Sequence, residues 1–509
     1  MTRELIRVIT CRVNGVYACE NKETLQTMLK GRYNFSGFVV SDWGACHSTS
    51  DSINHGLDIE MPRAKFMTKE NIQAALDVKN ITMAEIDDSC QRILSSYYAV
   101  PKAMRVPGPC GGGNCIDKMV KTPKHIALAR KLSAMSTVLL KNEGNILPLD
   151  KAKKQKIALI GLDAVVPYTG GSGSGAVSNA SAVSPVTALR ALGVDVSVCA
   201  WKCDVQAAVK LAKGADVAIV FGSAHTGEGH DRLNLNLGAN IDQIIPAVAE
   251  AQKNTIVVLS SPGSILTDWR GGVAAILYNG MPGEQVGPAL GDILFGVTAP
   301  QAKLPITMPN KENEQEFSVA QYPGIPCYDG EFPFPGSGGK GSSTGKHGKH
   351  DKMNGKCTCT NAACNLESTY SEGQIVGYRW YDKHNVKPAF AFGHGLTYGN
   401  FSYGGLQISG TTISFSVTRT SGSLSSCDTP QVYLGFPGAK ADPMKPNKQL
   451  RFFKKVCEAT NKLSFTVADA DVSNWDLATE SWKKTTGTYD VFVGTSSRDI
   501  ALVGSLTVA

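Results

Sequence analysis

Four apolar runs decide the fold of the central part of this chain: KIALIG (156–161), DVAIVFGS (216–223), TIVVLSSPG (255–263) and VAAILYNG (273–280). Helix-length segments such as IDQIIPAVAEAQ (241–252) separate them. Strands that alternate with helices form a parallel sheet covered on both faces. We therefore expect an α/β domain, an αβα sandwich, over residues 126–310.

The same domain is expected to open with a helix over residues 126–142. Its apolar residues recur every three or four positions, which places them along one helical face: Ile126, Ala129, Leu132, Met135 and Leu139.

The N-terminal part contains the run GFVVSD (37–42), then GLDIEMP (56–62), then a segment with helical periodicity over residues 69–98. Short strands that are buried on both faces and followed by helices are typical of parallel sheets and barrels. A first domain is expected over residues 1–106. The stretch VPGPCGGGNC (106–115) indicates a linker, which we extend over residues 107–125.

The C-terminal part changes to period two, in runs such as TTISFSVTRT (411–420) and GTYDVFVG (487–494). Ile413, Phe415 and Val417 are expected on one face of a strand, and Ser414 and Ser416 on the other. Several such strands predict an antiparallel β-sandwich over residues 370–509, so the fold class is α/β plus β. Residues 311–369 are expected to be a linker with a Gly- and Lys-rich insertion.

The composition is that of an ordinary globular protein, with 42% hydrophobic and 19% charged residues. No apolar run reaches the roughly 18 residues of a membrane span. The net charge of +7 comes with a cluster of lysines in the insertion, from Gly336 to Lys356, which indicates a solvated segment. Nucleic-acid binding is not expected, because no stretch interleaves basic and aromatic residues on a folded face.

The 14 cysteines favour disulfides and a secreted protein over a reduced cytosol. Disulfides are expected among Cys357, Cys359 and Cys364 and for the close pair Cys110 and Cys115, and a metal site is not, because no Cys-x-x-Cys pair is present. Glycosylation sequons agree with secretion, at Asn34, Asn80, Asn179 and Asn400. The first residues lack the apolar core of a signal peptide, so secretion requires sequence upstream.

Two carboxylates stand out by their setting. Asp42 ends the run GFVV and is followed by Trp43, at the place where a barrel strand delivers residues into an active site. Glu228 lies between Gly227 and Gly229 just beyond the run DVAIVFGS. For either residue alone, a surface charge or a helix cap is the more common role.

Seven groups of motifs shift that balance, because they resemble the glycoside hydrolases of family three, which include many β-glucosidases. They occur in the family's order from residue 12 to the C-terminus: RVNGVYACENKETL, GFVVSDWGA, GLDIEMP, STVLLKNEGNILPL, TGEGHDR, YNGMPGEQVGPALGDILFG with KLPITMP, and YSEGQIVGYRWYD with FAFGHGLTYGNFSY. The resemblance implies part of a (β/α)8 catalytic barrel, the αβα domain and a fibronectin type III-like sandwich.

The resemblance also implies roles. Asp42 is expected to be the nucleophile, Glu228 the general acid and base, and Trp43 an aromatic wall beside the sugar. A retaining mechanism needs the two carboxyl groups about 5–5.5 Å apart and in different protonation states. The expected function is release of a terminal β-linked glucose from a carbohydrate substrate, without a metal or organic cofactor. Because Trp43 follows Asp42, β-glucosides are favoured over the alternative, β-xylosides.

Other candidates are weaker. The run GGSGSG (170–175) lacks the Lys of a phosphate-binding loop. His225 and His230 are expected to be loop residues, and the neighbours Asp231 and Arg232 surface charges that could orient the loop of Glu228.

One departure from the family concerns the barrel. The family's nucleophile belongs near the seventh of eight strand-helix units, whereas Asp42 leaves room for about one unit before it at ~30 residues a unit. The expectation is that most of the barrel lies outside this sequence and that activity is impaired. A non-catalytic carbohydrate-binding or structural unit is the alternative.

Overall fold

The computed structural model describes residues 5–8, 12–101, 120–177, 181–228, 232, 234–238, 240–318, 321–322, 368–422, 425–476 and 478–509. The chain forms two compact units, Met1–Val120 and Lys121–Ala509. Each unit is described by itself below. The Gly- and Lys-rich insertion, the clustered cysteines at 357–364, the pair Cys110 and Cys115, and the sequon Asn179 lie outside the described residues.

The first unit is built on a short parallel sheet. Strand β1 (Leu5–Val8) pairs in parallel with β4 (Phe38–Ser41), and Val40 of β4 forms a further parallel bridge with Ile59. The described residues of this unit therefore contain adjacent parallel strands, as in a barrel, but no closed barrel. A small antiparallel hairpin, β2 (Arg12–Val13) with β3 (Val16–Tyr17), leads into η1 (Ala18–Glu20) and the helical segment η2 (Glu23–Arg32).

Three helices follow β4: α1 (Ser50–Asn54), α2 (Lys69–Asp77) and α3 (Met83–Ala99). The helical prediction for residues 69–98 is confirmed, with a break between α2 and α3. The break has a local cause, because Thr82 caps α3 and the Thr82 amide donates a hydrogen bond of 2.8 Å to the Glu85 carboxylate.

The second unit contains a six-stranded sheet in the order β5-β10-β9-β8-β6-β7. All neighbours are parallel except β5, which pairs antiparallel with β10 at the edge. The four apolar runs form β6 (Ile157–Ile160), β8 (Val217–Ser223), β9 (Thr255–Ser260) and β10 (Ala275–Tyr278), and the remaining strands are β5 (Val138–Asn142) and β7 (Val196–Cys199).

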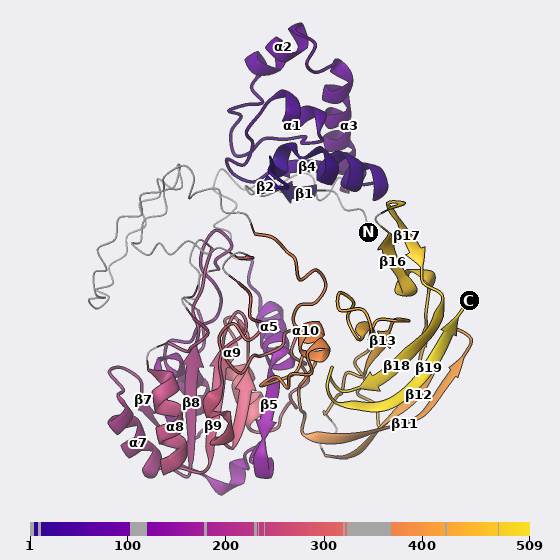
Figure 1. Ribbon diagram of the computed structural model, residues 1–509. Coiled ribbons are helices and arrows are strands. Elements are labelled where there is room, and N and C mark those ends of the chain that lie inside the picture. Colours follow the sequence, from indigo (N-terminus) through magenta and orange to yellow (C-terminus); the bar gives the residue numbers. More distant parts are fainter. Residues whose placement is uncertain are drawn as a thin grey trace. The chain divides into compact units, whose positions relative to one another are not determined.

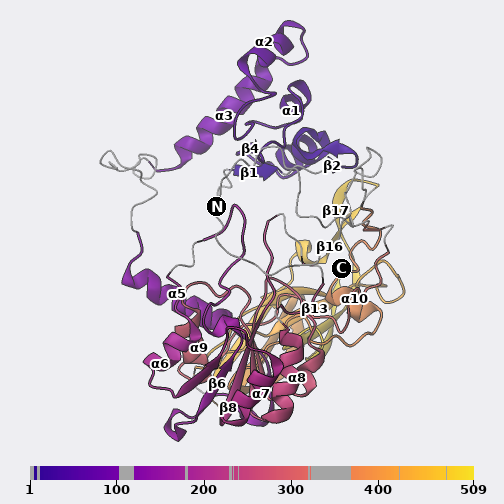
Figure 2. The same ribbon diagram turned by 90° about the vertical axis from the view of Figure 1, so that its left-hand side faces the viewer.

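Helices cover both faces of this sheet, as expected. Figure 2 shows α5 (Pro123–Ser136), α6 (Pro185–Ala191) and α9 (Val286–Leu294) on one side and α7 (Val205–Lys213) and α8 (Ile241–Ala251) on the other. Each face has its own hydrophobic core, one including Ile244 and Val248 and the other Leu189 and Ile293. Short helical turns complete the layer: η4 (Glu143–Asn145), η5 (Lys151–Lys153), η6 (Leu162–Ala164) and η7 (Asp268–Gly271).

The expected helix over residues 126–142 is wrong after Ser136. Helix α5 ends at Ser136, and β5 begins at Val138, so Leu139 lies on a strand and not on a helical face. The β-branched pair Thr137 and Val138 favours extended backbone, and β10 offers an edge that β5 completes. The pairing partner lies more than 130 residues away in sequence, so local periodicity did not reveal it.

The C-terminal part is the expected antiparallel sandwich, drawn in orange to yellow in Figure 1. Ile413, Phe415 and Val417 are buried together, whereas Ser414 and Ser416 are half-buried on the other face. One sheet has the order β11-β12-β15 and the other β14-β13-β18-β19. The strands are β11 (Gly399–Ser409), β12 (Thr412–Gly422), β13 (Gln431–Gly435), β14 (Gln449–Phe453), β15 (Thr460–Thr466), β18 (Gly487–Gly494) and β19 (Ile500–Val508).

A separate hairpin, β16 (Ser473–Asp476) with β17 (Ser481–Lys484), follows η8 (Asp469–Val472), and helix α10 (Tyr378–Lys383) precedes the sandwich. Among the described residues no helix is both long and apolar enough to cross a membrane.

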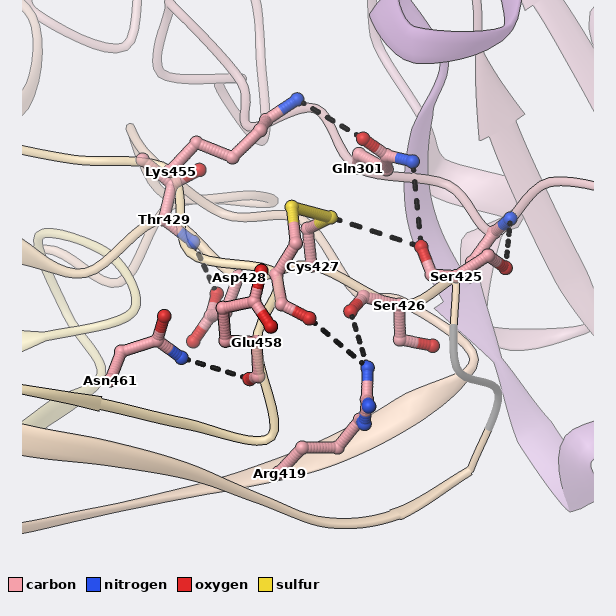
Figure 3. Close-up of a disulfide and its surroundings, with 12 residues drawn as sticks. Gln301, Arg419, Ser425, Ser426, Cys427, Asp428, Thr429, Lys455, Glu458 and Asn461 are labelled. Atoms are coloured by element: carbon pink, nitrogen blue, oxygen red, sulfur yellow. Dashed lines mark hydrogen bonds between the residues drawn. A yellow bond between two sulfur atoms is a disulfide. The ribbon is translucent and has the colours of Figure 1, made fainter.

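Two disulfides are present among the described cysteines, Cys199–Cys203 and Cys427–Cys457. Figure 3 shows the second one beside the segment that follows the α/β sheet. There Ser425 accepts a hydrogen bond of 3.2 Å from the amide of Ala299, and Lys455 donates to Gln301 at 3.4 Å. The disulfide thus joins two sandwich loops that both contact the α/β part of the same unit.

Candidate active site

Asp42 directly follows β4, at the carboxyl end of the parallel pair. Ser41 is fully buried, whereas Asp42 is partly exposed and Trp43 is 54% exposed. The chain therefore leaves the core at Asp42, as the sequence predicted, and presents an aromatic ring next to it.

The turn after β4 is held by backbone hydrogen bonds. The amide of Trp43 donates to Oδ1 of Asp42 at 2.6 Å, and the amide of Ala45 donates to the Asp42 carbonyl at 3.1 Å. Gly44 has a φ of +75°, which a residue with a side chain rarely adopts, and its amide donates to the carbonyl of Met61. These contacts fix the Asp42 carboxylate relative to the segment 59–61.

A buried ion pair between Lys30 and Asp58 contacts strand β4. Asp58 accepts hydrogen bonds from Lys30 Nζ at 2.8 Å, from the amide of Val39 at 2.7 Å and from Ser89 Oγ at 2.8 Å. Burial lowers the pKa of Lys30, and the Asp58 charge opposes that change. The pair links η2 and α3 to β4, because Lys30 lies on η2 and Asp58 also contacts Ser89 of α3 and Val39 of β4. The motif GLDIEMP does not by itself indicate this role for Asp58, because both partners of the ion pair meet only in the folded chain.

Glu60 of the same motif holds the next loop. Its Oε2 accepts the amides of Lys65, Phe66 and Met67 at 3.0, 3.0 and 2.8 Å. Glu60 is therefore a buried structural carboxylate, whereas Asp42 is partly exposed.

Cys19 lies beside Asp42 in the core of the first unit. Burial, the neighbouring Cys46 and the Asp42 charge raise the pKa of Cys19 to about 12. The sulfur next to Asp42 is therefore an uncharged thiol at neutral pH.

Glu228 lies five residues beyond β8 and is exposed. Its amide donates to the carbonyl of Ser172 at 3.3 Å, and Gly227 forms a parallel bridge with Ser172. The amide of Ser174 donates to Glu228 Oε2 at 2.6 Å, and the Ser174 hydroxyl donates to the same oxygen. The GGSGSG loop, which lacks the Lys of a phosphate-binding loop, thus holds the carboxylate of Glu228.

The glycines of both loops are needed for this approach. A Cβ at Gly173, where φ is +99°, would lie 2.4 Å from the Cβ of Glu228. A Cβ at Gly227 would lie 1.7 Å from Oγ of Ser172. Such contacts are far below van der Waals distance, so only glycine allows the two loops to meet. The density of glycine in both segments was the signal in the sequence that could have indicated a close approach.

A chain of hydrogen bonds lies at the end of β8, where the loop that carries Glu228 begins. Ser223 Oγ donates to Asp163 Oδ2 at 2.7 Å and lies 2.9 Å from Nε2 of His225. The ring of His225 stacks on Tyr168 with a centroid separation of 4.2 Å. His225 is a loop residue, as predicted. His230 and Asp231 lie outside the described residues, and Arg232 donates to the carbonyl of Ser264 at 2.8 Å.

Cavities of 270 and 460 Å³ adjoin this chain of residues, and both are lined by Tyr168, Gly170 and His225. The smaller one also reaches Ser172 and Gly227. Ligands of open α/β sheets bind beyond the carboxyl ends of the strands, where the chain turns to opposite sides, and here that point lies between β6 and β8. In the part of the chain that the structure describes, no group of three or more His, Cys, Asp or Glu residues could hold a metal ion.

Asp42 belongs to the first unit and Glu228 to the second, so the separation of about 5–5.5 Å that a retaining mechanism requires stays a prediction.

Family models match three parts of the chain. Residues 6–96 match the glycosyl hydrolase family 3 N-terminal domain, residues 137–398 match its C-terminal domain, and residues 428–497 match the fibronectin type III-like domain. The protein named "Probable beta-glucosidase L" of Aspergillus terreus is 32% identical over 98% of this chain and 70% of its own length.

Solved structures give the same result. The β-glucosidase of Bifidobacterium adolescentis is 28% identical, with a TM-score of 0.81 over 99% of this chain and 69% of that one. The β-D-glucoside glucohydrolase of Trichoderma reesei is 28% identical, with a TM-score of 0.80 over 99% of this chain and 72% of that one. The C-terminal domain match alone spans more than half of the chain, and the order of the three matched domains agrees with the fold; the chain belongs to glycosyl hydrolase family 3.

Proposed function

We propose that this chain acts as a retaining β-glucosidase that releases a terminal β-linked glucose from a carbohydrate substrate. The observation that carries the proposal is the loop contact in which Ser174 holds the Glu228 carboxylate by two donors. An exposed carboxylate that is oriented by two short hydrogen bonds from another loop is unlike an ordinary surface charge, which is solvated and mobile.

In the proposed first step, the Asp42 carboxylate attacks the anomeric carbon while the Glu228 carboxyl group donates its proton to the departing glycosidic oxygen. In the second step, the Glu228 carboxylate takes a proton from water as the water attacks the same carbon, and the bond to Asp42 breaks. Trp43 offers its exposed ring to the sugar.

The hydrogen bonds of Ser174 assign the two oxygens of Glu228. Both donors point at Oε2, so a proton on the carboxyl group is best placed on Oε1. The same donors favour the ionised carboxylate, which assists the second step. Oε1 is thus the atom proposed to exchange protons with the leaving group and with water.

A secreted location belongs to the same proposal. The sequon residues Asn34, Asn80 and Asn400 are all exposed, and two disulfides are formed. Both features suit an oxidising compartment in which glycans are added.

The test is hydrolysis of nitrophenyl β-glucoside and nitrophenyl β-xyloside by the 509-residue chain and by Asp42→Ala and Glu228→Ala variants. Glucoside hydrolysis that each substitution lowers by at least 10³-fold supports the proposal, because each carboxylate takes part in a bond-making step. The matched controls are Glu70→Ala and Glu250→Ala, which remove exposed helical carboxylates of the first and second unit.

Azide then separates the two roles. With azide, Asp42→Ala is expected to form an α-glucosyl azide and Glu228→Ala a β-glucosyl azide, because azide replaces the nucleophile in one case and water in the other. Faster xyloside than glucoside turnover would contradict the substrate assignment. A chain that binds glucose but turns over neither substrate would favour the non-catalytic alternative.

A further inference from the structure

The proposed acid and base sits at the end of a loop, and the structure shows what fixes that loop to the sheet. Strands β6 and β8 are parallel neighbours, with Ile160 opposite Val220, so the loops at their carboxyl ends start side by side. The loop after β6 contains Ser174, and the loop after β8 contains Glu228. We call them the serine loop (162–176) and the acid loop (224–228).

The tips of these loops are joined by few backbone contacts. They comprise the bridge between Ser172 and Gly227 and the hydrogen bond of 3.3 Å from the Glu228 amide to the Ser172 carbonyl. Residues 172–177 and Glu228 are exposed, so burial of apolar surface contributes little to holding the tips together. The Ser174 hydrogen bonds orient the Glu228 carboxylate, and contacts at the base of the loops keep Ser174 within reach of it.

Two aromatic rings provide that contact. Tyr168 of the serine loop stacks on His225 of the acid loop, with centroids 4.2 Å apart and an interplanar angle of 27°. The hydroxyl of Tyr168 donates to the carbonyl of Thr226 at 3.4 Å. Tyr168, six residues before Ser174, thus contacts the acid loop. His225, three residues before Glu228, contacts the serine loop.

Both rings are in turn anchored to the ends of the strands. Asp163 Oδ1 accepts the amide of Tyr168 at 3.0 Å, and Asp163 Oδ2 accepts the hydroxyl of Ser223 at 2.7 Å. Because Ser223 has a single proton and donates it to Asp163, Nε2 of His225 must donate to Ser223 Oγ, 2.9 Å away. Ser223 is buried at the end of β8, so this chain ties His225 to a rigid strand.

We propose that Tyr168 and His225 are positioning residues for Glu228: their stacked rings clamp the acid loop to the serine loop and so set where the Glu228 carboxyl group delivers its proton. This inference rests on the assignment of Glu228 as general acid and base. Loss of the clamp weakens proton delivery and leaves the attack by Asp42 unaffected, because neither ring belongs to the unit that carries Asp42.

The first experiment compares two substrates whose leaving groups differ in their need for a proton. Glucose is a poor leaving group, so the cleavage of cellobiose needs general acid catalysis. The dinitrophenolate of 2,4-dinitrophenyl β-glucoside is a good leaving group and departs without a proton. Tyr168→Ala and His225→Ala are expected to lower kcat/KM for cellobiose by about tenfold or more, which is part of the roughly 10²–10⁴-fold that general acid catalysis contributes. The same variants are expected to change kcat/KM for the dinitrophenyl substrate by less than about threefold.

Conservative and matched variants sharpen the result. Tyr168→Phe keeps the stacked ring and is expected to retain most of the cellobiose activity. The control is His384→Ala, which removes another surface histidine that stacks on an aromatic ring, Trp380, at 4.5 Å in the same unit. It is expected to behave like the wild type on both substrates.

Glu228→Gln separates failure of this proposal from failure of the proposed function. If that variant does not distinguish the two substrates, Glu228 is not the acid, and the proposed function fails. If it does distinguish them, but the Tyr168 and His225 variants lose activity equally on both substrates or lose none, the clamp is overturned.

Hydrogen exchange gives a readout that does not depend on turnover. Peptides that cover 170–176 and 224–228 are expected to exchange faster in Tyr168→Ala and in His225→Ala than in the wild type, and unchanged in His384→Ala. Exchange that stays unchanged in the two clamp variants would overturn the proposal.

Discussion

Ser174 donates its backbone amide and its hydroxyl to one oxygen of Glu228, 54 residues further along the chain. Both donors stabilise the negative charge, so they favour the ionised carboxylate. The contact also brings together two loops that have little buried surface of their own.

Ser174→Ala removes one donor and keeps the other. Because this donor helps to orient the Glu228 carboxyl group, its loss is expected to lower kcat/KM for cellobiose by up to about tenfold if the hydrogen bond contributes about 1.5 kcal/mol. The loss should be smaller for 2,4-dinitrophenyl β-glucoside, because its leaving group does not need a proton. Ser172→Ala, which keeps the backbone carbonyl that Glu228 uses, is the control. A Ser174→Ala variant that hydrolyses cellobiose as fast as the wild type contradicts this reading.

Gly173→Ala introduces a Cβ 2.4 Å from the Cβ of Glu228 at a φ of +99°. The loop must shift to relieve the contact, so we expect kcat to fall by about 10²-fold or more, since misplacement by about 1 Å has such an effect. Gly175→Ala is the matched control, because a Cβ there meets nothing within 4 Å. Equal activity of the two variants would show that the approach of the loops is not required.

Lys30→Met leaves Asp58 buried without its cation. Removal of one partner of a buried ion pair costs about 3–5 kcal/mol, so the first unit should unfold at clearly lower urea concentration. The double variant with Asp58→Asn should recover part of that loss, because no isolated charge remains. Lys69→Met, on the exposed start of α2, should leave the transition in place. An additive double variant would argue against coupling between the two side chains.

The Cys427–Cys457 disulfide closes a loop with a sequence separation of 30. The chain-entropy relation predicts a loss of about 3–4 kcal/mol in the free energy of unfolding when both are replaced by Ser. Replacement of Cys199 and Cys203, which are only 4 residues apart, should cost less, about 2 kcal/mol. Urea unfolding of the two double variants checks the order. A larger loss for the shorter loop would show that local packing and not chain entropy dominates.

The sheet and the sandwich were largely predictable because their signals are local. The runs that became β6, β8, β9 and β10 are mostly apolar strands of four to seven residues, and Ile413, Phe415 and Val417 alternate with serines. The end of α5 was mispredicted, because Leu139 continues the helical period although its partner strand β10 lies far along the chain. Periodicity reports which face of an element is apolar, and it carries no information about a distant pairing partner.

By itself, the sequence determined the two kinds of layer, the family resemblance and the two carboxylates that we assign to catalysis, because these depend on short motifs such as SDW around Asp42. Only the tertiary structure decided which residues hold those carboxylates. Ser174 reaches Glu228 because β6 and β8 are parallel neighbours, and Lys30 reaches Asp58 because η2 packs beside β4. The order of strands in a sheet comes from long-range packing, so contacts at their ends appear only once the chain is folded.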